Sequence, residues 1–566
     1  MADDTTPLLT EQLNSNVSLR SQTSSKEFSG SENIDYRRIK PNEKSSKSHL
    51  ALAIIACILG SPLQIGLNTA ILNAPEEVIK EFYNETYFDR YNDFMSDSLL
   101  TMLWAITVAF FCVGGMIGGV SAAYFAGKYG RKSTLLLNNA VAFTCAALQG
   151  CSKVSKSFEM LIAGRVVAGI CCGLNSAVAP LYLAEISPVS LRGFCGTCNQ
   201  LSITLGVLIG EVIGMKQLLG TEAFWPILVA SPAIPAIYSL ATLTFCPESP
   251  KYLLVNKGDD DAAEAALIWL RKTQDVSEEM EAMRKERVEL RNSPKFSVMD
   301  LWRTSELRWP LIICIVLQMS QQFSGINAVI YYSTSIFGSA GLSKESSQYA
   351  TVGTGAVNVM MTFVSALIMD RAGRRTLHMI GLGGMCIFSI VLVVCLSLQS
   401  TLPWLSYISI VAVIIYIIFF ATGPGAIPWF MVAEMFAQSP RTAAVGVSVV
   451  VNWLCNFTVG IVFPILQKAI ETYSFLPFSV MLLLFFIFTY MFVPETKGKS
   501  ISEITRLFKS PTVGSSVNDL PESDISYESL RNRYSTQVLI IDPPGIDETP
   551  EYSIQTSGTS EKVEFQ

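Results

Sequence analysis

The chain has 566 residues and a formal net charge of −6, and Lys, Arg, Asp and Glu together make up 16% of it. A soluble globular chain carries about 25% of these residues, which excludes a string of ordinary soluble domains. The composition instead predicts an all-α membrane protein. The charged residues gather in the two tails and in one central segment, leaving two long apolar blocks between them.

Residues 1–48 form a polar tail rich in Ser, Thr and Glu, which predicts a disordered cytosolic segment. Within it, Leu8 and Leu9 end a pattern that resembles an acidic dileucine sorting signal. A sorting adaptor is therefore an expected partner.

The first apolar block covers residues 49–246. Its polar breaks leave runs of about 20 residues, the length that crosses a bilayer, and these predict an N-terminal bundle of six helices. The expected spans are 50–72, 99–124, 133–150, 158–182, 195–216 and 222–246. Residues 73–98 are expected to form an outer loop, in which Asn84 begins a sequon and is a predicted glycosylation site.

Residues 247–309 combine mixed charge with helical periodicity and predict a cytosolic linker with short helices. The second apolar block, 310–493, predicts a C-terminal bundle of six helices. Its expected spans are 310–337, 347–369, 376–399, 404–433, 442–467 and 474–493. Residues 494–566 are expected to be a largely disordered cytosolic tail, in which Tyr527 begins a pattern that resembles a tyrosine-based sorting signal.

Basic residues fall in alternate short loops, with Lys128, Arg192, Arg371 and Arg441 as examples. Because Lys and Arg are retained on the cytosolic side, this pattern predicts that both termini are cytosolic.

Three patterns occur twice, in the same order and at nearly constant spacing: a Gly-Arg-basic triplet, a Glu with an Arg seven residues later, and a Pro-Glu pair. The repetition predicts that the second six helices repeat the first six in parallel. Charged members of these patterns lie at predicted cytosolic helix ends. We expect them to form ion-pair clusters that latch the halves together in one state and release them in another, although they could instead only anchor helix ends at lipid headgroups. These residues are Arg131, Glu185, Arg192, Glu248, Arg374, Arg375, Glu434, Arg441 and Glu495.

Neutral amides are the main polar groups inside the predicted spans. An amide both donates and accepts hydrogen bonds, as a hydroxyl-rich neutral solute requires, and an aromatic face packs well against a pyranose. Interhelical hydrogen bonding is the competing explanation. It does not easily account for Gln321 and Gln322 together, because adjacent residues point to different helix faces.

Glycine and proline interrupt the tenth predicted span at Gly423, Pro424, Gly425 and Pro428. Backbone groups left unpaired in a membrane are tolerated only beside a cavity or another helix. We therefore expect a broken, mobile helix beside the substrate.

The motifs GRK (130–132), GRR (373–375), PESP (247–250) and PETKG (494–498), with the run QQFSGINAVIYYSTSIF (321–337), resemble the sugar-porter branch of the major facilitator superfamily, and the animal facilitative glucose transporters in particular. The resemblance covers about residues 50–505. It implies a sugar site made of Gln200, Gln321, Gln322, Asn327, Asn358, Trp429, Asn452 and Trp453, with Tyr331, Tyr332 and the break in the tenth span as its gate. One position departs from the pattern, because Ala421 stands where such transporters place a Glu.

The expected function is facilitative transport, or uniport, of D-glucose or a related hexose by alternating access at the plasma membrane, with endosomal cycling. No enzyme activity, cofactor, metal or nucleic-acid partner is expected. A non-transporting sugar receptor and an exporter of amphipathic cations are competing hypotheses.

A proton-coupled hexose symporter is a further hypothesis. Proton-coupled relatives carry an acid in the first helix that pairs with an Arg in the fourth. Here Arg165 is present, but Asn68 stands at the position expected for its acidic partner. Glu211 keeps symport open, although we expect this residue at the outer surface or paired with Arg165.

Overall fold

The computed structural model describes residues 48–292, 296–399, 401–499 and 501–508. The expectations for the tails, including those for Leu8, Leu9 and Tyr527, lie outside these residues. Across the described ranges the chain forms helices joined by turns and contains no strand.

Eleven helical runs of the described chain are long and apolar enough to cross a membrane, and α21 (Leu476–Phe492) is a shorter twelfth. The predicted twelve-helix architecture is confirmed. The first six spans are α2 (Ser48–Gly60) with α3 (Pro62–Ala70), α5 (Asp97–Tyr129), α6 (Arg131–Cys151), α7 (Phe158–Ile186), α8 (Arg192–Ile213), and α9 (Trp225–Ala230) with α10 (Ala233–Leu243). The second six are α14 (Ser305–Gln322) with α15 (Ile326–Ser339), α16 (Lys344–Ala372), α17 (Arg374–Leu398), α18 (Leu405–Thr422) with α19 (Ile427–Met435), α20 (Gln438–Ile470), and α21.

Helices also occur outside the spans. The expected outer loop contains α4 (Glu76–Tyr91), and the linker contains α11 (Asp260–Arg271), α12 (Ser277–Asn292) and α13 (Val298–Arg303). We call the end of the helix bundle that carries Gly130 and Gly373 the basic end, and the opposite end the α4 end.

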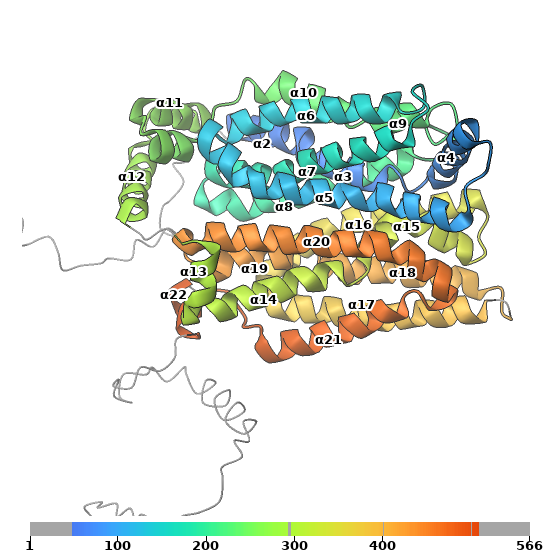
Figure 1. Cartoon of the computed structure of the whole chain (residues 1–566). Coiled ribbons are helices and arrows are strands. Elements are labelled where there is room, and N and C mark those ends of the chain that lie inside the picture. Colours follow the sequence, from blue (N-terminus) through green and yellow to red (C-terminus); the bar gives the residue numbers. More distant parts are fainter. Residues whose placement is uncertain (1–47, 293–295, 400, 500, 509–566) are drawn as a thin grey trace, which may run out of the picture. The chain divides into compact units, whose positions relative to one another are not determined.

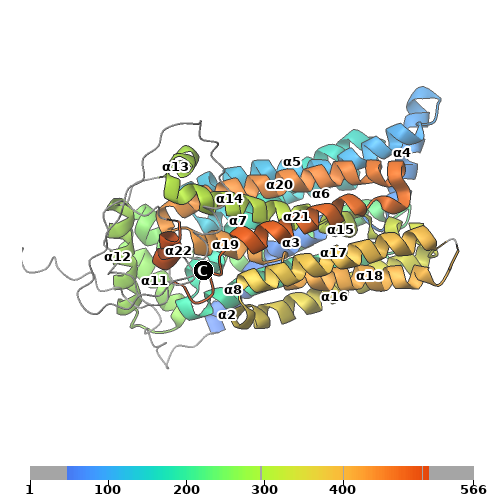
Figure 2. The ribbon, with the colours of Figure 1, turned by 90° about the horizontal axis from the view of Figure 1, so that it is seen from below.

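The two halves meet along two seams, in which α5 packs against α20 and α8 packs against α16 (Figure 1). The same helices run side by side in the second view of the ribbon (Figure 2). A cavity at the centre of the bundle is therefore bounded by both halves.

Glycines on two faces of α5 allow the close approach of its neighbours. A Cβ at Gly114 would lie 1.9 Å from Val166 O on α7, and a Cβ at Gly115 would lie 2.5 Å from the Trp453 ring on α20. The same alternation recurs one turn later at Gly118 and Gly119. Because residues four apart share a helix face, one glycine pair brings α7 close and the other brings α20 close, which places Trp453 against α5.

Candidate functional site

A cluster of amides joins α14 to α20 across the middle of the C-terminal half. Asn452 Nδ2 donates to Gln318 Oε1 at 2.8 Å and to Gln321 Oε1 at 2.7 Å. Gln322 Nε2 donates to Asn452 Oδ1 at 3.0 Å. Asn327, at the start of α15, donates to Gln322 Oε1. All five side chains are buried. Apart from Gln318, they belong to the eight residues expected to bind sugar, so the structure brings four of those eight together.

The predicted break in the tenth span is present, since α18 ends at Thr422 and α19 begins at Ile427. The carbonyls freed there have partners. Gln321 Nε2 donates to Pro424 O at 2.9 Å and to Gly425 O at 2.7 Å. The break and the amide cluster therefore form one hydrogen-bonded unit.

A small cavity lies between the halves, bounded by α8 on one side and by α16, α18 and α19 on the other. Gln200 and Asn358 line it from opposite halves, and Gly425 lines it beside the amide cluster. The cavity extends to Thr197 near the start of α8 and to Met369 near the end of α16, which places it toward the basic end. Ala421 also lines it, at the position where the resemblance places a Glu.

The two expected tryptophans lie on helices that flank this region. Trp429 on α19 is partly buried and packs in a cluster that includes Trp453 and Phe111. The ring of Trp453 meets that of Phe111 edge to face, with centroids 5.6 Å apart. The Arg165 guanidinium lies over the Phe111 ring at 4.5 Å, so aromatic and cationic groups contact one another in a row from α20 to α7.

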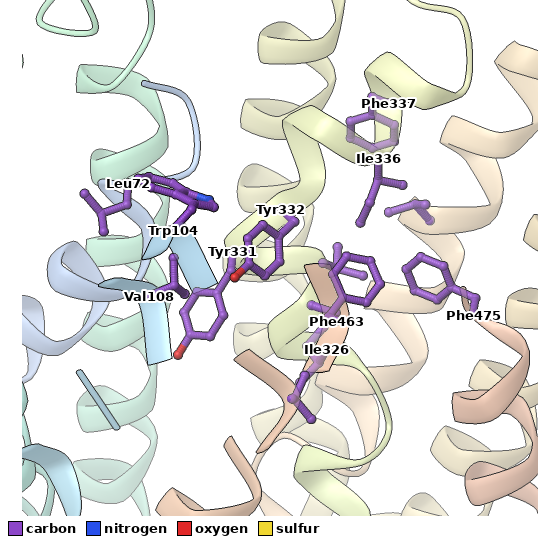
Figure 3. Close-up of a cluster of buried hydrophobic side chains, with 14 of the residues drawn as sticks. Leu72, Trp104, Val108, Ile326, Tyr331, Tyr332, Ile336, Phe337, Phe463 and Phe475 are labelled. Carbon is purple, nitrogen blue, oxygen red and sulfur yellow. The ribbon is translucent and has the colours of Figure 1, made fainter. Parts of the chain in front are cut away.

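Tyr331 and Tyr332 lie in α15, at the point where its backbone departs from helical geometry at Tyr332. Tyr331 OH donates to Asn456 Oδ1 at 3.1 Å, and Tyr332 OH donates to Gly460 O at 3.0 Å. The Tyr332 ring stacks on Phe463 within the buried aromatic cluster (Figure 3). Both tyrosines therefore hold the kinked α15 against α20.

Hydrogen bonds between the halves close the α4 end. Asn73, just beyond α3, donates to Ile330 O at 2.8 Å and accepts from Thr334 N at 3.2 Å. Lys344 Nζ pairs with Glu77 at 2.6 Å. With the cavity located toward the basic end, the structure represents a state in which the α4 end is closed.

A comparison of the chain with protein families identifies it. The family described as "Sugar (and other) transporter" matches residues 52–508, which is most of the chain. The chain belongs to this sugar transporter family.

Facilitated glucose transporters are among the relatives of the chain. Member 1 from Gallus gallus is 46% identical over 469 residues, covering 82% of this chain and 95% of the relative. Member 3 from Bos taurus is 45% identical over 463 residues, covering 82% and 93%. Both matches span nearly the whole relative, so the similarity includes both halves.

Solved structures share the fold. The proton:xylose symporter XylE bound to 6-bromo-6-deoxy-D-glucose matches with a TM-score of 0.68 and 25% identity, covering 82% of this chain and 99% of that chain. The inward-open conformation of XylE from E. coli matches with a TM-score of 0.66 and 26% identity, covering 81% and 100%. The sugar transporter is thus a multi-pass membrane protein of the major facilitator fold.

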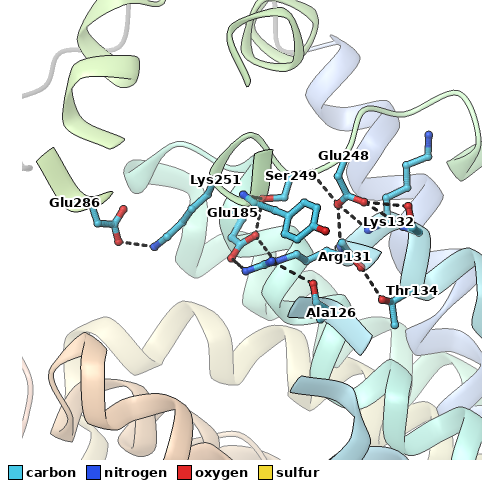
Figure 4. Close-up of polar contacts among 12 residues, drawn as sticks. Ala126, Arg131, Lys132, Thr134, Glu185, Glu248, Ser249, Lys251 and Glu286 are labelled. Atoms are coloured by element: carbon cyan, nitrogen blue, oxygen red, sulfur yellow. Dashed lines mark hydrogen bonds and ion pairs between the residues drawn. The ribbon is translucent and has the colours of Figure 1, made fainter. Parts of the chain in front are cut away.

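The repeated charge patterns of the sugar transporter form matching clusters at the basic end. Arg131 Nε pairs with Glu185 Oε2 at 2.8 Å, and Glu248 Oε1 accepts from the backbone N–H of Arg131 at 2.8 Å (Figure 4). In the second half, Arg374 Nε pairs with Glu434 Oε1 at 3.0 Å. There Glu495 accepts from the backbone N–H groups of Arg374 and Arg375 at 2.8 and 3.1 Å.

A glycine precedes each cluster, and the local geometry of the backbone requires it in both halves. Gly130 and Gly373 have φ of +102° and +90°, which favour glycine. A Cβ at either position would also approach the carboxylate of Glu248 or Glu495, at 2.3 and 2.6 Å. Each carboxylate therefore caps the next helix at a turn that only glycine fits.

Both clusters join helices of the same half, whereas the latch expected from the sequence requires contacts between halves. Two of the nine expected residues lie apart from these clusters in this state. Arg192 is exposed, and Arg441 donates to Phe436 O at 3.1 and 3.0 Å. The latch itself stays a prediction about the opposite state.

The expectation for Glu211 is wrong on both counts. Its side chain is 3% exposed, so it does not lie at the surface. Arg165 does not pair with it but donates to Asn68 O at 2.8 Å. The carboxyl faces α16, and this could not be predicted from the sequence because the α8–α16 register depends on packing between the halves.

Some cavity residues were not predicted from the sequence. Thr362 and Ser365 line the cavity one and two turns after Asn358 on the same face of α16. Phe420 and Phe430 line it from α18 and α19. Helical spacing from Asn358 could have predicted the two hydroxyls, whereas the phenylalanines resemble ordinary apolar positions.

Asn84 lies in the middle of α4 and is partly buried, and Thr86 of its sequon is buried. Glycosylation at Asn84 stays a prediction.

Proposed function

We propose that this sugar transporter equilibrates D-glucose or a related hexose across the plasma membrane by alternating access, without coupling to another gradient. The observation that carries the proposal is the amide cluster, which is hydrogen-bonded to the carbonyls of a broken helix beside a cavity between the halves. The similarity to facilitated glucose transporters over most of their length supports the same substrate.

The proposed sugar site is the cavity together with the amide cluster. Gln200 and Asn358 reach the sugar from opposite halves, and Gln321, Gln322, Asn327 and Asn452 exchange some of their mutual hydrogen bonds for bonds to its hydroxyls. Such an exchange is favourable because an amide both donates and accepts. Trp429 and Trp453 supply the aromatic faces that a pyranose prefers.

The proposed gate combines two elements that touch this site. Gln321 bonds directly to the break at Pro424 and Gly425, so occupation of the site changes what holds α18 and α19 together. Gly423 and Pro428 flank the same break. Tyr331 and Tyr332 hold the kinked α15, whose movement opens or closes the α4 end.

We place the basic end in the cytosol, because Lys and Arg in short loops are retained there. This orientation puts both tails in the cytosol and α4, with the proposed glycan at Asn84, outside. It also makes the structure an inward-facing state. In the opposite state, Arg192 and Arg441 would meet the acids of the other half and close the cytosolic side. The tail motifs at Leu8, Leu9 and Tyr527 are proposed adaptor sites for endosomal cycling.

Counterflow of labelled glucose tests transport against a receptor function. Vesicles that contain the purified chain are loaded with unlabelled glucose and diluted into a trace of labelled glucose. A carrier brings label in transiently above its equilibrium level, whereas a receptor binds label without accumulating it. Vesicles without protein and vesicles given labelled L-glucose are the controls.

A proton-coupled symporter is the second candidate, because the solved XylE structure is that of a proton:xylose symporter. The region around Arg165 argues against it. The guanidinium donates to the backbone of Asn68, and α3 contains no carboxylate to take up a proton. The amide of Asn68 cannot take up a proton on one side of the membrane and release it on the other, so we favour uniport.

A further inference from the structure

Glu211 is a buried carboxyl that the proposed sugar site does not use. It lies in the last turn of α8, and 3% of its surface is exposed. Its Oε2 atom has no hydrogen-bond partner in the part of the chain that the structure describes. Gly355 of α16 lies directly against it, because a Cβ there would come within 2.0 Å of that oxygen. The carboxyl is therefore enclosed in the seam between the halves.

Among the described residues, no Lys or Arg pairs with this carboxyl. Helix α3, packed along α8, carries no titratable residue. Arg165 of α7 is turned toward Asn68 and Phe111, and Lys344 of α16 pairs with Glu77. The other titratable residues on or just after the helices packed against Glu211 are Arg192, Cys195, Cys198 and Lys216 for α8, Glu345, Tyr349, Asp370 and Arg371 for α16, Glu159, Cys171, Cys172, Tyr182 and Glu185 for α7, and His49 and Cys57 for α2.

An ionised carboxylate without a partner in a dry interior is far costlier than a protonated carboxyl. The closed seam therefore favours Glu211 with a proton. Cross-half contacts seal it from the α4 end, where Lys216 N donates to Gln348 Oε1 at 3.1 Å and Gln217 Nε2 donates to Tyr349 OH at 3.4 Å. Opening of the α4 end must break these contacts, and water then reaches the carboxyl.

We propose that Glu211 is a proton-binding site, occupied when the α4 end is closed and emptied when it opens. Access is from one side only. Gln200, which lines the cavity, lies about 16 Å away along α8 at 1.5 Å per residue, and Leu208 packs against Gly355 between the two. Because the proton enters and leaves on the same side, none crosses the membrane with the sugar.

This inference rests on the proposed alternating access and adds regulation to it. A group that takes up a proton on closure stabilises the closed state as pH falls, and loses that effect as pH rises. Acid at the α4 side therefore slows glucose entry without changing the final glucose distribution.

The test measures initial glucose entry into cells that express the full chain, over a range of external pH at constant cytosolic pH. Wild-type entry is expected to fall several-fold toward acid, by at most about tenfold per pH unit because one proton is involved. Glu211→Gln cannot ionise and should give a flat profile near the acid value, whereas Glu211→Asp should restore the slope. Glu345→Gln removes an exposed acid from the start of α16 and should keep the wild-type profile.

A flat wild-type profile, or an unchanged slope in Glu211→Gln, overturns the proposal. Cytosolic acidification in step with glucose entry, lost in Glu211→Gln, overturns one-sided access. A second measurement compares wild type with Glu211→Gln at the same pH in the absence of glucose. Hydrogen exchange of the α8 and α16 backbone amides at the α4 end reports how often the seam between these helices opens. Faster exchange in the wild type at alkaline pH supports the site even if the chain moves no glucose, and equal exchange contradicts it.

Discussion

Individual side chains in this transporter serve packing and recognition at once. The amides of α14 and α20 satisfy most of one another's hydrogen bonds in the absence of sugar, which offsets much of the cost of desolvation. Gln318 Nε2 is the exception, because it is buried without a partner among the described residues. The same groups can reorganise around a hydroxylated solute, because each keeps both donor and acceptor capacity. The central feature of the site is thus exchangeable hydrogen bonding rather than fixed charge.

We predict that Trp429→Ala lowers glucose uptake between about twofold and about tenfold at matched surface abundance. The basis is the loss of one aromatic contact, which is worth about 0.5 to 1.5 kcal/mol beyond area burial. Trp404→Ala is the control, because Trp404 is exposed at the start of α18. Equal uptake by wild type and Trp429→Ala would remove this residue from the site.

We predict that Gln321→Ala and Asn452→Ala are not additive. Their side chains share a 2.7 Å hydrogen bond, and contacting residues typically couple by about 0.5 to 3 kcal/mol. Glucose affinity of the two single variants and the double variant measures the coupling. A double variant whose loss equals the sum of the single losses would show that the pair does not act as a unit.

At the scale of helices, close approach depends on the small residues of α5. We predict that Gly115→Ala reduces thermal stability and transport, because its Cβ would lie 2.5 Å from the Trp453 ring and force that ring to move. Gly127→Ala is the matched control on the same helix, since nothing lies within 4 Å of its Cβ. It should be neutral or slightly stabilising, as alanine favours helix by about 1 kcal/mol over glycine. Equal melting temperatures of the two variants would contradict this account of the α5–α20 seam.

The charged loops should control the balance between states. We predict that Arg441→Ala shifts the population toward the state open at the basic end, because closing that end would bring this arginine closer to the acids of the other half. Labelling of a cysteine introduced at Thr197, which lines the cavity, should become faster from the basic side. Lys285→Ala, which removes an exposed basic residue of α12, controls for charge alone. Unchanged labelling would argue against the latch.

The sequence predicted elements better than contacts. The twelve spans followed from hydropathy, and the break at Gly423 followed from glycine and proline. The break between α14 and α15 was missed, although Gly325 has φ of +90° and lies against Phe478. Amide chemistry was visible in the sequence, but the pairing of Gln321 with Asn452 depends on the register of α14 against α20. The enclosure of Glu211 likewise depends on packing between halves, which local sequence does not encode.

At the scale of the whole molecule, each half has an equivalent set of contacts at the basic end, whereas the halves differ at the proposed sugar site. The ion pairs Arg131–Glu185 and Arg374–Glu434 repeat with nearly the same geometry, whereas the amide cluster lies in the C-terminal half. This division suits a carrier in which equivalent scaffolds move about an asymmetric site. Coupling to protons would require a titratable group that is reached from both sides of the membrane. Asn68 cannot titrate, and the proposed access to Glu211 is from one side only.

The most direct test of uncoupled glucose transport uses vesicles that contain the purified chain, with equal glucose on both sides and acid outside. Because Asn68 cannot titrate and the proposed access to Glu211 is from one side only, the internal glucose concentration should stay equal to the external one. The imposed pH should alter only the rate at which labelled glucose exchanges. Net accumulation of glucose above the external concentration, abolished when the pH gradient is collapsed, would contradict the account.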